Sequence, residues 1–425
     1  MERRFEARKQ ELVDDAKIKS TVFNGAMDRL VQFAQPFIEL LPRSEHKEHA
    51  QTYIGGLMSD LKQKNIESIA YRYDQDRMNL QRFIGWGSWD HAPLMQELAR
   101  QVGTELGESD GVIVFDPSGF KKSGRDSVGV QRQWLGRIGK VDNGQVAVYM
   151  GYASRKEHAL VGTRLYLPKE WARDRKRRKK CGVPKEIRFR TRHELALEML
   201  HEEGTVLPHG WIAGDDEMGR STRFRRDLRA LGEQYLLNVP SNTGIRDLAG
   251  KRPPYGGHGA RPKRPFERVD QWAAALPESA WTRVDVRDGE KGPLVVHIVK
   301  TRVVARTERK HRGATEELLV VTRSEEEHGK VKLDYSLSNA PVETPLEELA
   351  RVVKAEHRIE DCIERAKGEA GLANYEVRNW TGWYHHQVLS LMATWFLIRE
   401  KQRGKKMDAG HHGLADPNRP CVAAA

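Results

Sequence analysis

Few features of secreted, disulfide-bonded or membrane proteins occur in this sequence. Its 425 residues include three cysteines, Cys181, Cys362 and Cys421, whose wide separation fits neither a disulfide framework nor a zinc site. The longest apolar run, VLSLMATWFLI at residues 388–398, is too short to cross a bilayer, and the opening MERRFEARKQEL is too charged for a secretory signal. We therefore expect a cytoplasmic protein without a membrane partner.

Positive charge is in excess. The chain has 72 lysines and arginines against 60 aspartates and glutamates, a formal net charge of +12. With 38% apolar and 31% charged residues, it has the composition of a globular protein long enough for two or three domains. The basic excess favours a polyanionic partner, and nucleic acid is the leading candidate.

The pattern of apolar residues changes along the chain. Residues 1–105 carry helical periodicity, as in HAPLMQELARQVGTEL. Three strand candidates follow, GVIVFD, SVGVQRQWLGRIG and QVAVYMGYAS, and helices then alternate with the strands GWIAGDD and YLLNVP. Residues 106–245 therefore predict the first part of an α/β domain.

The remaining chain divides into three segments. Residues 246–345 contain β-rich runs such as GPLVVHIVKTRVVARTER and predict an inserted β-rich subdomain. Residues 346–402 have helical spacing and predict the second part of the α/β domain, with a flexible tail at 403–425.

Acidic residues follow two of the predicted strands. Asp116 ends GVIVFD before a Pro-Ser-Gly turn, so it is either a turn former or a functional group. Asp215 ends GWIAGD in the same way, and ligand sites of α/β sheets tend to lie beyond strand ends. Glu360 lies on one helical stripe with Glu364 and Lys367. Two aspartates and a glutamate suit Mg²⁺, which prefers oxygen ligands.

These segments together resemble a bacterial insertion-sequence transposase of the DDE superfamily, from about residue 116 to about residue 397. The resemblance is carried by FDPSGFKKSG, SVGVQRQWLGRIGKVDNGQVAVYMGY, GDDEMG and HRIEDCIERAKGEAGLANYEVRNWTGWYHHQVLSLMATWFL. It implies a ribonuclease-H-like mixed sheet flanked by helices, with a helical N-terminal DNA-binding region. It also implies that the β-rich insertion precedes the catalytic glutamate, as in one branch of the family.

The resemblance implies a role for several residues. Asp116, Asp215 and Glu360 would be the catalytic metal ligands for Mg²⁺, for which Mn²⁺ can substitute, and Lys367 would contact phosphate. The chain departs from the family pattern in two places. Met218 stands where many relatives have tyrosine, and Glu356 and Val353 replace the arginine and tyrosine that precede the glutamate.

The implied activity is phosphoryl transfer on DNA, in which two metal ions activate the nucleophile and stabilise the leaving oxygen. The enzyme would cut at the ends of its element and join the 3′-hydroxyl ends to target DNA. Its partners would be double-stranded DNA, as terminal inverted repeats and target, and a second copy in a homodimer on paired ends, in the bacterial nucleoid. Two alternatives are a catalytically inactive or domesticated DNA-binding derivative and a ribonuclease-H-like nuclease without transposition.

Other residues are candidates for DNA contact. Lys121, Lys122 and Arg125 follow Asp116 closely and are predicted phosphate neighbours. The basic run RDRKRRKK at 173–180 is either a solvated loop or a phosphate contact. Its members that we assign to DNA are Lys176, Arg177 and Arg178.

Aromatic residues have two interpretations as well. Trp272 and Trp281 of the insertion could stack on an unpaired base, although aromatics also pack subdomain cores. For the cluster NWTGWYHHQ at 379–387, core packing is the favoured interpretation.

Overall fold

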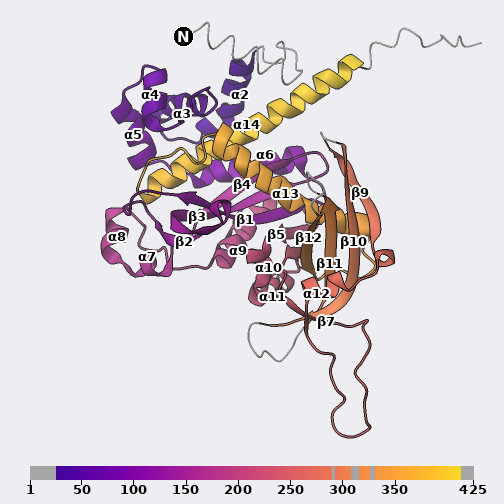
Figure 1. Cartoon of the computed structure of the whole chain (residues 1–425). Helices are drawn as coiled ribbons and strands as arrows, with labels where there is room; N and C mark the ends of the chain where they lie inside the picture. Colours follow the sequence, from indigo (N-terminus) through magenta and orange to yellow (C-terminus); the bar gives the residue numbers. More distant parts are fainter. Residues whose placement is uncertain (1–24, 290–291, 308–314, 326–330, 413–425) are drawn as a thin grey trace, which may run out of the picture.

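The computed structural model describes residues 25–289, 292–307, 315–325 and 331–412 (Figure 1). From residue 25 the chain is helical, as its periodicity predicts, and it continues into a mixed sheet flanked by helices. The N-terminal helices are α2 (Ala26–Ile38), α3 (Ser44–Leu57), α4 (Ile66–Arg72), α5 (Arg77–Trp86) and α6 (Ala92–Leu106).

The centre of the sheet has the arrangement expected of a ribonuclease-H-like fold. Its strands lie in the order β4-β3-β1-β5-β6, in which β1 pairs antiparallel with β3 and parallel with β5. The buried run Val112 to Phe115 suits a central strand that is covered on both faces. The predicted α/β fold class is confirmed. The strands are β1 (Val112–Lys121), β2 (Gln131–Leu135), β3 (Lys140–Ala153), β4 (His158–Leu165), β5 (Trp211–Gly214) and β6 (Tyr235–Asn238).

The β-rich insertion continues this sheet. Its last strand pairs antiparallel with β6, and the order then runs β12-β11-β10-β7-β8. Side chains on β11 alternate between two cores: Leu318 and Val320 pack in the main core, and Leu319 and Val321 pack in a second one. The elements are β7 (Gly244–Asp247), β8 (Glu267–Arg268), α12 (Val269–Ala274), β9 (Thr282–Gly289), β10 (Gly292–Ala305), β11 (Glu316–Glu325) and β12 (Val331–Ser338).

The connecting and C-terminal helices cover the sheet. Helix α13 packs on β1 and β5, and α14 packs on β4 and on the N-terminal helices α3 and α5. In Figure 1, α14 runs between helices α2 to α5 and the sheet, and α6 lies on the sheet side of it. The helices are α7 (Lys169–Arg173), α8 (Arg175–Lys180), α9 (Arg192–Glu202), α10 (Asp216–Arg220), α11 (Thr222–Ala230), α13 (Leu346–Glu369) and α14 (Trp380–His412).

The N-terminal helices share the main hydrophobic core with the sheet domain. The rings of Phe33 and Phe396 lie 5.3 Å apart, and the Tyr53 hydroxyl lies 2.8 Å from His386 Nδ1. Both His386 and its neighbour His385 are fully buried, which confirms core packing for the aromatic and histidine cluster.

Two segments differ from the sequence-based expectation. The basic run at 173–180 is largely helical, because Asp174 caps α8 by accepting a hydrogen bond from the Arg177 backbone N–H. Helix α14 extends to His412, beyond the predicted boundary at residue 402. The rest of the predicted tail, residues 413–425 with Cys421, lies outside the described residues.

Cys181 and Cys362 are buried free thiols. Within the described ranges, no helix is long and apolar enough to span a membrane.

Candidate active site

The two predicted aspartates lie side by side on adjacent interior strands of the sheet, where the parallel pairing of β1 and β5 ends. Strands β1 and β5 are parallel, and Phe115 pairs with Gly214, so Asp116 and Asp215 follow in the next register position. Neighbouring strands are about 4.8 Å apart. Both residues are half-buried. The Pro-Ser-Gly turn expected after Asp116 is wrong, because β1 continues through Pro117 to Lys121 and stays paired with β3. Asp116 is therefore an interior residue of the strand and a member of a carboxylate pair.

Local structure fixes the Asp215 carboxylate. It caps α10 by accepting a hydrogen bond of 3.0 Å from the Met218 backbone N–H. Helix α10 packs tightly against the end of β6, since a Cβ on Gly219 would lie 1.9 Å from the carbonyl oxygen of Asn238. Only glycine fits there, and the close packing holds the cap beside β1.

Helix α13 brings further acids to this pair. It approaches β3 closely at Gly151, where an added Cβ would lie 2.5 Å from Ile359. Ile359 lies between two glutamates one turn apart. Glu356 is buried at 9% exposure, whereas the side chain of Glu360 is 62% exposed.

The acids repel one another and favour a bound cation. Burial raises the pKa of Asp116 to about 7, with further contributions from Glu356 and then Glu360, and Lys367 partly opposes the rise. Burial and the charge of Asp116 raise the pKa of Asp215 well above its usual range. Within the described part of the chain, no hydrogen bond or ion pair reaches the Asp116 carboxylate.

Glu356 was noted in the sequence only as a departure from the family pattern and was not expected beside the aspartates. Glu364 is the alternative that the helical stripe suggests, but its side chain is half exposed and lies 3.2 Å from Lys367 Nζ. Glu356 instead acts on the pKa of both aspartates. Its position one turn before Glu360 was the available signal, because residues i and i+4 share a helix face.

A buried charge cluster joins the insertion to α13. Asp334 on β12 accepts a hydrogen bond of 3.0 Å from Lys354 and lies 3.6 Å from His357. Contact with Asp334 and Glu356 raises the pKa of His357 to about 9. Ligand-capable atoms of Glu356, His357 and Glu360 all lie within 4.8 Å of one another.

The residues present fit a divalent metal ion. The carboxylates of Asp116 and Asp215 lie near those of the α13 glutamates, and carboxylate oxygens are the ligands that hard cations prefer. Burial and the neighbouring acids raise the pKa of both aspartates, and a bound cation would favour their ionised forms. Asp116 and Asp215 with Glu360 or Glu356 would hold the ion.

Four of the predicted phosphate contacts have partners inside the protein: Lys122, Arg177, Arg178 and Lys367. Lys122 donates a hydrogen bond of 3.1 Å to the Tyr375 carbonyl, and burial lowers its pKa to about 8. Arg178 donates to the carbonyls of Ala172 and Pro184. Lys367 is buried near Asp116, over the Phe120 ring. Phosphate contact by these residues stays a prediction.

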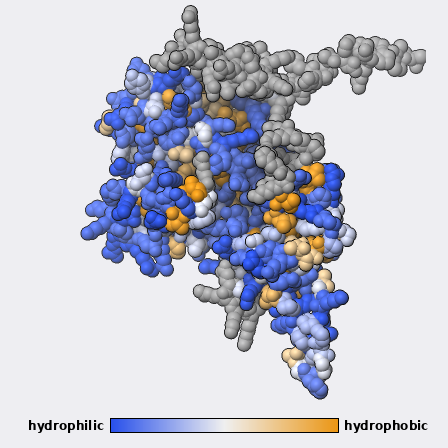
Figure 2. Space-filling view, in the orientation of Figure 1, coloured by the Kyte–Doolittle hydropathy of each residue, from blue (hydrophilic) through white to orange (hydrophobic). Residues whose placement is uncertain are grey.

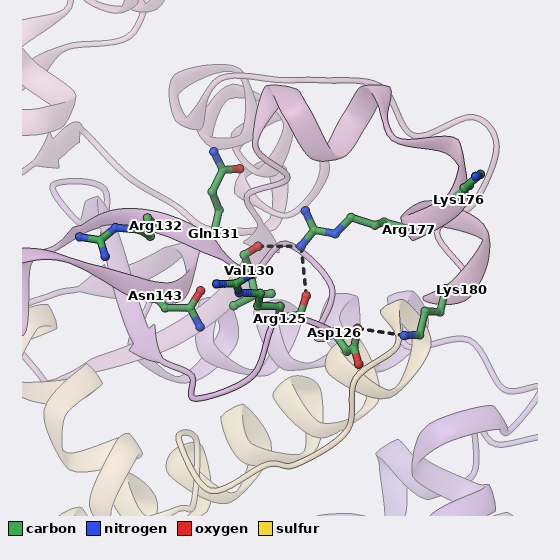
Figure 3. Close-up of a pocket in the computed structure, with 9 residues that line it drawn as sticks. All are labelled: Arg125, Asp126, Val130, Gln131, Arg132, Asn143, Lys176, Arg177 and Lys180. Carbon is green, nitrogen blue, oxygen red and sulfur yellow. Dashed lines mark hydrogen bonds and ion pairs between the residues drawn. The ribbon is translucent and has the colours of Figure 1, made fainter.

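Of the predicted contacts, Lys121, Arg125 and Lys176 are exposed, whereas Arg177 is half-buried. Lys121 lies 3.4 Å from Asp142 at the end of β1. Arg125, Lys176 and Arg177 line a cavity of about 510 Å³ between the β2–β3 hairpin and α8 (Figure 3).

The two insertion tryptophans are involved in packing. Trp272 is 8% exposed in the second core and donates a hydrogen bond to Asp247. Trp281 packs against the same core, with Arg323 over its ring. Base stacking by either tryptophan stays a prediction.

Comparison with known proteins gives two matches. The family model described as DDE superfamily endonuclease matches residues 36–293, which include both aspartates and end before α13. A protein of Microchaete diplosiphon, named as a probable transposase for insertion sequence element IS701, is 30% identical over 221 residues. That match covers 51% of this chain and 55% of the relative, so the chain spans about half the length of this relative.

Proposed function

Because the chain belongs to the DDE superfamily of endonucleases, we propose that it is the transposase of an insertion sequence. It would cut DNA at the ends of the element and join the freed 3′-hydroxyl ends to target DNA. The observation that carries the proposal is the pair Asp116 and Asp215 on adjacent parallel strands, with a glutamate helix packed over them. The name of the IS701 relative supports the insertion-sequence assignment.

Family members use divalent metal ions, and Mg²⁺ is the ion that we propose here, with Mn²⁺ as a substitute. When bound, the metal would lower the pKa of the attacking water or 3′-hydroxyl and stabilise the leaving oxygen. Asp116 on β1 and Asp215 after β5 would bind it from the sheet. Glu360 is the third ligand that the family pattern implies, with Glu356 beside it.

The chain's own residues would also orient the DNA. Lys367 places a buried positive charge close to Asp116, where the scissile phosphate would lie. The Met218 backbone N–H holds the Asp215 carboxylate at the start of α10, next to β1. Neither contact depends on the tyrosine and arginine that the family pattern has and this chain lacks.

We propose double-stranded DNA as the partner, both as terminal inverted repeats and as target. A homodimer would hold two ends together in the bacterial cytoplasm, associated with the nucleoid through DNA. End recognition would rest largely on residues 1–105 and the insertion 246–345. Since α2 to α6 share the main core, this assignment is best tested by surface substitutions rather than by truncation.

The test is a strand-transfer assay. A plasmid carries the DNA that flanks the gene, including its inverted repeats, and is incubated with the full chain, target DNA and Mg²⁺. The proposal predicts 3′-hydroxyl ends at the repeat boundaries and their covalent joining to target DNA. Asp116→Asn should abolish both products and leave end binding intact, because it removes a ligand charge at constant size.

Each alternative function predicts another result. Cutting without joining would indicate a nuclease that does not transpose. Specific binding with neither product, at every Mg²⁺ and Mn²⁺ concentration tried, would indicate an inactive derivative. Either result contradicts transposition.

A further inference from the structure

Two cavities adjoin on the side of the molecule that carries α7 and α8. The first, of about 510 Å³, lies between the β2–β3 hairpin and α8, and the second, of about 450 Å³, lies between α5 and the segment before α14. Asp126 and Lys180 line both cavities, so the cavities adjoin at this ion pair. The two cavities together are called the groove. The surface around α7 and α8 is mainly hydrophilic (Figure 2).

The first cavity is strongly basic. Figure 3 shows Lys180 paired with Asp126, at 2.9 Å, and Arg177 donating to the carbonyls of Arg125 and Val130. Arg177 also stacks over the buried Trp171 ring, so it forms the wall. The other cationic residues of this cavity are Arg125, Arg132 and Lys176. They are exposed and form no ion pair within the described residues. Such cations suit DNA phosphates.

The second cavity contains an exposed tryptophan. Trp86 ends α5 and is 68% exposed, whereas the same helix buries Leu80, Phe83 and Ile84 in the core. Its ring is therefore not required for packing. The cations and acids that line this cavity are equal in number: Arg77, Lys180 and Arg378 against Glu67, Asp126 and Glu376. A neutral, flat and polar ligand fits such a lining better than a phosphate does.

We propose that this groove binds an unpaired stretch of DNA, with backbone phosphates in the first cavity and one base stacked on Trp86 in the second. Base–aromatic stacking beside a basic track is how proteins hold single strands. Bases in a duplex already stack on one another, so the site selects unpaired DNA. The inference rests on the proposed function only in taking DNA as the ligand.

The groove lies away from the carboxylates. Asn143, in its first cavity, donates hydrogen bonds to the carbonyls of Lys122 and Gly124, just after the end of β1. From Asp116 to Lys121 the strand spans roughly 17 Å at about 3.3 Å per residue. The groove would therefore hold DNA beside the cleavage site rather than in it.

The test is a binding titration of the full-length protein in EDTA with a short fluorescein-labelled single strand of mixed sequence. Trp86→Ala should weaken binding about 5- to 150-fold, the range for loss of one base–aromatic stack, and Trp86→Phe should retain most of the affinity. A 2-aminopurine base in the strand should lose its fluorescence on binding wild type and keep more of it with Trp86→Ala.

A second variant tests the first cavity. Arg132→Ala with Lys176→Ala should reduce the slope of log affinity against log salt by about 1.4 for the single strand. Tyr71→Ala is the matched aromatic control, because Tyr71 is 93% exposed in α4 and lines neither cavity. It should bind like wild type, and fully paired duplex should not distinguish Trp86→Ala from wild type.

Equal binding by Trp86→Ala and wild type would overturn the proposal, as would equal losses in Trp86→Ala and Tyr71→Ala or an unchanged salt slope. Circular dichroism of each variant verifies folding. Because the titration contains no divalent metal, its failure leaves the strand-transfer result unaffected, and failed strand transfer leaves this result standing.

Discussion

Asp334 should stabilise both the fold and the active-site helix. It is nearly buried on β12, and its partner Lys354 on α13 is also nearly buried. Burial acts to raise the pKa of Asp334, but His357 and Lys354 lower it well below its usual range. In Asp334→Ala, Lys354 would remain buried with a charge that no carboxylate compensates. Loss of one partner from a buried pair costs about 3–5 kcal/mol.

Urea unfolding followed by circular dichroism measures this cost. Asp334→Ala should lower the free energy of unfolding by that amount, and Asp334→Ala with Lys354→Met should recover most of it because the buried lysine charge that lost its partner is removed as well. The matched control is Asp285→Ala, which removes an exposed acid of the same insertion that is paired with Arg283. An Asp334→Ala loss no larger than the control's would refute the reasoning, as would a double variant no more stable than Asp334→Ala.

Three further predictions concern packing, pH and the third acid. Gly219→Ala should greatly reduce folded yield or metal-dependent cleavage, because its Cβ would meet a carbonyl oxygen; wild-type yield and activity would contradict the packing. Burial lowers the pKa of His386 to about 3, so the unfolded state is protonated first below about pH 6.5 and stability falls toward pH 3. Between pH 7 and 5 this histidine should contribute a loss of about 2 kcal/mol in urea unfolding, and a His386→Gln variant with an equally steep pH dependence would contradict it. Glu360→Gln should abolish cleavage and spare end binding, and Glu364→Gln should have little effect; if Glu356→Gln alone is inactive, the third ligand lies one turn earlier than the family pattern implies.

The sequence predicted which candidate residues lie together where an acidic residue follows an apolar run typical of a strand. Asp116 and Asp215 each end an apolar run, and parallel pairing of the two runs is sufficient to bring the acids together. Glu356 was harder to identify. The helical period places Glu356, Glu360 and Glu364 on one stripe, and only the contact of Ile359 with Gly151 determines which turn faces the aspartates.

Packing between segments far apart in the chain could not be predicted from the sequence either. Periodicity showed that the N-terminal helices have an apolar face, but not that this face would pack on α14, more than 300 residues away in the chain. The helix at residues 175–180 depends on a single cap at Asp174, a local signal that the surrounding charge run obscured. Trp86 went unnoticed because its exposure is a property of the packed fold, not of its neighbours in sequence.

The most direct test of the central claim is metal-dependent cleavage of DNA that carries the flanking inverted repeats, measured for wild type, Asp116→Asn and Asp215→Asn. Wild type should cut at the repeat boundaries in Mg²⁺ and not in EDTA. Both variants should bind the same DNA without cutting it. Cleavage by either variant at the wild-type rate, or by wild type in EDTA, would show that the pair Asp116 and Asp215 is not the centre of the reaction.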